Sequence, residues 1–212
     1  MQDRYRACGQ AARRSGVPRY AIETEMMVGF RSPLCRSLYD YWLGLPKPEG
    51  SLLPLKSSLD PTAIPKLLPR VVFHDLRQPG RSILRLVGTG MAEQYGFDPT
   101  GHDYIEYVAP ERQASALAQL VKVAAHPCGM RVVIENVHAS GKSIVDEAAG
   151  FPFEADDGSG RFLLFVDDAV ERPAFHDPRR KPLELLRVLE REFIDIGAGV
   201  PPLDEVFPTR SG

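Results

Sequence analysis

The stretch that decides the fold runs from residue 83 to residue 108 and reads ILRLVGTGMAEQYGFDPTGHDYIEYV. Residues 82–87, SILRLV, form a short β-rich run that predicts a strand. Two glycines end this strand, and MAEQYG at 91–96 then predicts a short helix that Gly96 ends. DPTG at 98–101 is a turn sequence. The stretch therefore predicts a strand that leads into a cluster of short helices.

The flanking sequence on both sides predicts the neighbours of this strand. VVFHDL at 71–76 has the same β-rich character, and Gln78-Pro79-Gly80 between the two runs predicts a hairpin. PERQASALAQLVKVAAH at 110–126 predicts the longest helix, with Pro110 in its first turn and Pro127 beyond its end.

Three further strands are predicted at 130–139, 142–154 and 161–168. Short connections that contain glycine join them, which favours an antiparallel meander. The pattern thus predicts an α+β fold with one five-stranded antiparallel sheet, a helical cluster on one face, and flanking N- and C-terminal helices.

The chain divides into four parts along its length. Residues 1–33 form a polar basic arm, and 34–69 hold an N-terminal helix at 34–45 and a proline-rich lead-in. Residues 70–168 form the core, and 169–212 form a linker, an amphipathic helix and a tail. The last helix is predicted at 181–197, where apolar residues step by 4, 3, 4 and 3, the spacing of a coiled coil. It would pack on its own domain or meet a partner through Leu186, Leu189, Phe193 and Ile196.

The composition excludes several classes of protein. The 212 residues carry a net charge of −2, with 43% hydrophobic residues, which argues against a basic nucleic-acid-binding surface over the whole chain. No apolar run reaches the length of a membrane span, and no secretory signal precedes the core. The three cysteines form no CxxC pair, so we expect reduced thiols and a cytoplasmic location.

The order of elements resembles the PAS sensor fold. Residues 83–108 resemble the PAS core, and Ser37–Arg70 resembles the lead-in of a PAS subfamily found in small stand-alone bacterial proteins. The resemblance implies a sensory or protein-interaction module without catalytic residues. It would hold a small-molecule ligand between the sheet and the helical cluster, and it would often be a homodimer. The segments outside 35–168 are too short for an output domain, so we expect a separate signalling protein as partner.

The cofactor is left open by the sequence. PAS domains that bind flavin covalently carry an Asn-Cys-Arg-Phe-type run, and the matching GMAEQYGF at 90–97 has no cysteine. Haem is also not expected, because His126 ends a helix where a solvent-facing charge is favoured. Adjacent His-Asp pairs such as His74-Asp75 point to opposite faces of a strand, so we expect no metal site. HASGKS at 138–143 lacks the first glycine of a P-loop and reads as a hairpin turn.

The face of each predicted strand and helix indicates which side chains would line a pocket. The same side chains also suit a dry core, so both interpretations remain open. The candidates are Leu84, Leu86, Met91, Tyr95, Tyr104, Leu117, Val121, Val132, Ile134 and Leu164.

Two alternatives from other classes remain. A small enzyme with a ketosteroid-isomerase-like cone fold needs an acid or histidine in an apolar cavity, and Asp146, Glu147 and His138 are the candidates. A docking subunit without a ligand would use the same fold as a binding surface.

Overall fold

The computed structural model describes residues 28–108, 110–138, 143–171 and 183–203. The α-helices are α3 (Pro33–Gly44), α4 (Thr89–Tyr95) and α5 (Pro110–Ala125), and four short 3-10 helices are η1 (Lys56–Ser58), η2 (Pro61–Ala63), η3 (Leu68–Arg70) and η4 (Tyr104–Tyr107). The strands are β1 (Val71–Asp75), β2 (Ile83–Val87), β3 (Cys128–His138), β4 (Ser143–Glu154), β5 (Arg161–Glu171) and β6 (Leu183–Asp195). Most of the basic arm, the linker at 172–182 and the tail from 204 lie outside the described residues.

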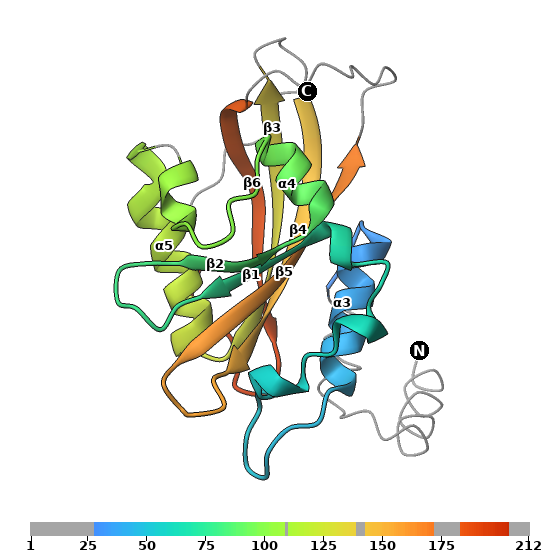
Figure 1. Cartoon of the computed structure of the whole chain (residues 1–212), viewed down its shortest axis with the longest axis vertical. Helices are drawn as coiled ribbons and strands as arrows, with labels where there is room; N and C mark the ends of the chain where they lie inside the picture. The colour runs from blue at the N-terminus through green and yellow to red at the C-terminus, as the bar shows by residue number, and fades with distance from the viewer. Residues whose placement is uncertain (1–27, 109, 139–142, 172–182, 204–212) are drawn as a thin grey trace, which may run out of the picture.

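The strands form a single sheet in the order β2-β1-β5-β4-β3-β6, and every neighbouring pair is antiparallel. Figure 1 shows α3 on one side of this sheet and α5 on the other. The predicted hairpin β1–β2 and the meander β3–β4–β5 are confirmed. A helix-bearing connection between β2 and β3 carries α4, η4 and α5, as the sequence predicts.

The predicted C-terminal helix is wrong, because residues 183–195 form the edge strand β6, which pairs with β3. The sheet therefore has six strands instead of five. The register shifts at Leu189, which has no partner on β3, and this bulge changes which residues share a face. Phe193 packs on one side of the sheet and Ile196 on the other. The apolar spacing of 4, 3, 4 and 3 thus comes from a strand in which a bulge interrupts the alternation of side chains. Residues 183–195 form no helix, so these side chains do not share one helical face.

The N-terminal helix is confirmed at α3, and its start follows from local chemistry. The Ser32 hydroxyl accepts hydrogen bonds from the backbone N–H groups of Leu34 and Cys35, which is the capping role that serine favours. Pro33 occupies the first helical position, where its missing N–H costs no helical bond. The face turned to β4 and β5 is fully buried and consists of Cys35, Leu38, Tyr39 and Trp42.

Each face of the sheet carries its own apolar core. On the α3 side, Trp42 stacks on Phe151 with ring centroids 5.5 Å apart, and its indole N–H donates to the carbonyl of Pro152. On the opposite side, Leu120 and Val123 of α5 pack against the sheet.

Gly96, at φ 84°, ends α4 in the left-handed conformation that glycine favours.

Candidate ligand-binding face

The face of the sheet that carries α4, η4 and α5 is here called the helical-cluster face. Six of the predicted pocket residues lie on it. Three of these side chains are buried in the apolar core of this face, and three more are half-buried and pack against it. The buried three are Leu84, Met91 and Val132, and the half-buried three are Tyr95, Tyr104 and Ile134.

Leu86 does not belong to this face. Phe73 pairs with Leu86 and His74 pairs with Leu84, so Arg85 between them has no partner on β1. This bulge reverses the alternation on the edge strand, and Leu86 is exposed as a result. Val87 takes its place and packs against the core of the helical-cluster face.

Leu164 and two α5 residues were also placed wrongly. Leu164 is buried in the core on the α3 side, because both faces of β5 are apolar and alternation alone could not assign them. Val121 is exposed and Leu117 is half-buried outside the core. Helix α5 instead packs Leu120 and Val123 against the sheet.

Two carboxyl groups lie on the same face as these apolar residues. Asp146 is 2% exposed, and Asp167 lies opposite Ala148 in the register between β4 and β5. The Asp167 Oδ1 atom is buried and accepts no hydrogen bond from the described residues, and a guanidinium nitrogen of Arg70 lies 3.7 Å from it. Burial, together with the negative charges of Asp146 and Asp168, raises the pKa of Asp167 to about 8 against the opposing effect of Arg70.

Hydroxyl and imidazole groups complete the polar part of this face. Burial raises the pKa of both Tyr95 and Tyr104, so both phenols stay protonated at neutral pH. His74 contacts the Ser82 hydroxyl through Nδ1 at 2.9 Å, and its ring meets Tyr104 edge-on. Burial lowers the pKa of His74 to about 3, so this imidazole is neutral at pH 7.

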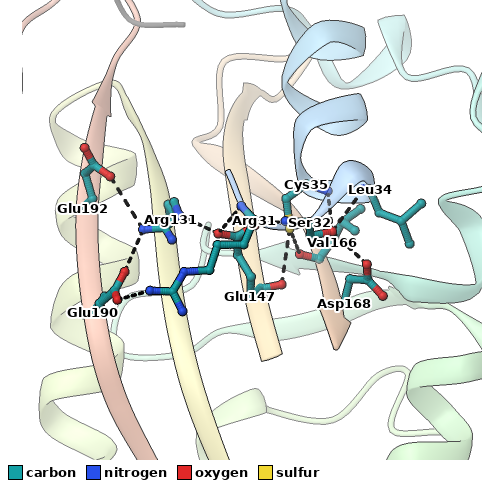
Figure 2. A network of polar contacts seen from close by, with 10 residues as sticks. All are labelled: Arg31, Ser32, Leu34, Cys35, Arg131, Glu147, Val166, Asp168, Glu190 and Glu192. Carbon is teal, nitrogen blue, oxygen red and sulfur yellow. Dashed lines mark hydrogen bonds and ion pairs between the residues drawn. The ribbon is translucent and has the colours of Figure 1, made fainter. Parts of the chain in front are cut away.

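The α3 side of the same strands carries a second polar group, shown in Figure 2. Glu147 of β4 is fully buried and accepts hydrogen bonds from the backbone N–H groups of Arg31 and Ser32, the latter at 2.7 Å. The Arg131 Nε of β3 donates to the same carboxylate at 2.6 Å. This buried carboxylate therefore binds the chain just before α3 to two strands of the sheet.

Further contacts extend this arrangement, which we call the α3 anchor. The Ser32 hydroxyl donates to Asp168 of β5 at 2.8 Å. Arg131 also reaches Glu190 of β6 at 3.1 Å, and the Arg31 guanidinium pairs with that same glutamate. Figure 2 shows these contacts running from β6 through β3 and β4 to the start of α3.

The structure separates the two described acids named for the cone-shaped enzyme, and Asp146 is the one buried on the helical-cluster face. Asp146 and Glu147 were its two hairpin acids, and they lie on opposite faces of the sheet. The side chain of His138 lies outside the described residues. Within the part of the chain that the structure describes, no three His, Cys, Asp or Glu residues form a metal-binding group.

Sequence reasoning missed Asp167, although a signal was present. It alternates with Leu163 and Phe165 on β5, and those two apolar residues face the helical cluster. Arg131 was not among the predicted site residues, and its contact with Glu147 reveals its role.

Comparison with known proteins identifies the family. The sequence matches the model of the PAS domain over residues 30–164, and the chain belongs to the PAS domain family. Members of this family are generally sensory or interaction modules and are typically not enzymes. The PAS prediction is thus confirmed. No curated protein matches the sequence.

Several solved structures are similar. A light-oxygen-voltage domain studied with a flavin analogue is 17% identical, with 52% of this chain and 84% of that chain covered and a TM-score of 0.40. The LOV protein of Rhodobacter sphaeroides is 13% identical, with 55% and 71% covered and a TM-score of 0.40. VqmA bound to DPO is 15% identical, with 51% and 56% covered and a TM-score of 0.40. The flavin analogue and DPO are ligands of those proteins.

Among the described residues, no helix combines the length and the hydrophobicity needed to cross a bilayer.

Proposed function

We propose that this chain is a sensory PAS module that binds a small molecule between the helical-cluster face and the short helices, and that it signals to a partner protein. The single observation that supports the proposal is the Asp167 Oδ1 atom, which is buried on this largely apolar face and accepts no hydrogen bond from the described residues. A buried oxygen without a hydrogen bond is costly, and a ligand that brings a hydrogen-bond donor or a positive charge would offset this cost.

The tyrosines on this face suit the same role. Tyr95 and Tyr104 each combine an aromatic ring with a hydroxyl group, which allows apolar contact and hydrogen bonding with one ligand. Met91 adds an adaptable apolar side chain beside them. The ligand class that fits is a small, partly apolar molecule with a donor or cationic group.

The test is native mass spectrometry of the purified protein beside its denatured mass, with an absorbance scan of the same sample. A bound molecule that is lost on denaturation, and that Ala148→Phe displaces, would support the proposal. Ala148 is buried on the helical-cluster face, so a phenyl ring there fills space between sheet and helices. Ala114→Phe on the exposed side of α5 is the control.

A bare chain in the native spectrum would contradict ligand binding and favour the docking subunit. The same spectrum measures the oligomeric state and so tests the homodimer, which stays a prediction. The predicted cytoplasmic location also stays a prediction.

A further inference from the structure

Two neighbouring strands carry adjacent acidic residues that face opposite sides of the sheet. On β4 these are Asp146 and Glu147, and on β5 they are Asp167 and Asp168. Successive residues of a strand point to opposite faces, so Asp146 and Asp167 face the helical cluster whereas their neighbours face α3. The register pairs Glu147 directly with Asp168. On each of the two strands, the acid that faces the helical cluster and the acid that faces α3 are therefore consecutive residues.

The acids on the α3 side hold the positive end of a helix. The backbone N–H groups of Arg31 and Ser32 and the Ser32 hydroxyl all donate to Glu147 or Asp168. The start of a helix carries a partial positive charge, and the Arg31 guanidinium adds a full one. Any further negative charge in the sheet beneath the start of α3 attracts the same N–H groups and the Arg31 guanidinium.

The two faces already affect each other electrostatically. The charge of Asp168, on the α3 side, helps to raise the pKa of Asp167. The charge of Asp167 in turn helps to raise the pKa of the Cys35 thiol in the first turn of α3. Coupling of this kind is reciprocal, because a group that changes the ionisation of Asp167 must respond to that ionisation.

We propose that these four acids form an electrostatic relay across the sheet, in which a negative charge on Asp167 tightens the α3 anchor and its neutralisation loosens the anchor. A proton or a bound cationic ligand would neutralise it. The part played by a ligand rests on the proposed function, whereas the response to charge is a property of the chain itself.

The surroundings of Asp167 identify it as the group that changes charge. Asp146 on β4 and Asp168 on β5 disfavour its ionisation, and Arg70 of η3 favours it. Tyr95 of α4 and Tyr104 of η4 also face it, and the raised pKa of each keeps these phenols neutral.

The first test is amide hydrogen exchange over residues 31–36, measured on the ligand-free wild type and on Asp167→Asn at a pH well above the Asp167 pKa of about 8, where the wild-type carboxyl is ionised. We expect exchange about threefold faster in the variant, the size of effect for single charges separated by about one Debye length. Asp157→Asn removes an equal charge from an exposed turn and should leave this exchange unchanged. Equal exchange in Asp167→Asn and wild type would overturn the relay.

The reciprocal test titrates the Asp167 carboxyl carbon by nuclear magnetic resonance. Ser32→Ala weakens the anchor but leaves all four acids in place, so we expect the acid dissociation constant of Asp167 to fall about threefold. If Ser32 had only a structural role, its replacement would leave the acid dissociation constant of Asp167 unchanged. That result would refute the proposal.

Two features keep the outcome decisive. If Asp167→Asn does not fold, the wild type alone can be compared below and above the Asp167 pKa of about 8, with exchange corrected for its chemical pH dependence. Tighter protection above that pH is expected, and equal protection contradicts the relay. A bare native mass spectrum would contradict only the ligand role, because these tests use no ligand.

Discussion

Replacement of Glu147 by alanine tests the α3 anchor most directly. The variant removes a fully buried carboxylate and leaves the Arg131 guanidinium, whose side chain is 7% exposed, without its nearest partner. Loss of one member of a buried ion pair costs about 3–5 kcal/mol. The N–H groups of Arg31 and Ser32 also lose their acceptor, at about 1–3 kcal/mol for a buried donor. Arg131 keeps Glu190, and water can reach the opened site, so we expect a total loss of about 4 kcal/mol.

The assay is equilibrium urea unfolding, followed by the fluorescence of Trp42. This is the single tryptophan of the chain and is fully buried on the α3 side. The midpoint should fall while the denaturant slope stays constant, which separates lost stability from a change in the unfolded state. Glu154→Ala, at the half-buried end of the same strand, is the control and should change the free energy of unfolding by less than about 0.5 kcal/mol.

A double variant tests whether the lost stability comes from the unpaired charge of Arg131 or from lost packing. In Glu147→Met with Arg131→Met, both charges are replaced by apolar side chains, so no buried charge is left unpaired and more than half of the loss should be recovered. A loss below about 1 kcal/mol in Glu147→Ala would refute the reasoning, as would a double variant no more stable than the single one.

Three further outcomes follow from the packing and the buried imidazole. Trp42→Ala should cost about 4 kcal/mol in urea unfolding followed by circular dichroism, whereas Leu86→Ala, on an exposed side chain, should cost less than about 0.5 kcal/mol; similar losses would contradict the assigned core. Gly150→Ala places a Cβ atom 2.3 Å from the Phe165 ring, so its melting temperature should fall and Phe165→Leu should restore part of it. Absence of any rescue would rule out this contact as the cause. The pKa of His74 is lowered to about 3 from 6.5, so the unfolded chain takes up a proton first on acidification. Wild type should therefore lose stability relative to His74→Gln as the pH falls below about 6.5, by at most about 1.4 kcal/mol per pH unit; parallel pH profiles would contradict this.

Local sequence determined the elements whose energetics are local. The cap at Ser32, with Pro33 after it, defines the start of α3 through contacts within three residues. The hairpin β1–β2 and the turn after α4 follow in the same way, because glycine and proline restrict the backbone wherever they occur. The hairpin and turn signals, together with the order of the elements, were sufficient to predict the PAS family.

The assignment of side chains to faces was less certain from sequence. Alternation placed Val132 on the helical-cluster face, since β3 carries charged residues on its other side. On β5 both sets of side chains are apolar, so the face of Leu164 depended on which layer packed against it. Bulges at Arg85 and Leu189 shifted the alternation by one residue, and only strand pairing shows where such a bulge lies.

Tertiary structure alone decided the last strand and the anchor. Residues 183–195 have an apolar spacing that suits a helix, but the open edge of β3 offers backbone hydrogen bonds along their whole length. That edge exists only after the meander has formed, so no local pattern could reveal it. Glu147 likewise meets Arg31 across 116 positions of sequence. The sequence by itself determined the elements as far as β5 and their order, whereas the assembled sheet decided the last strand and which buried charges would neutralise one another.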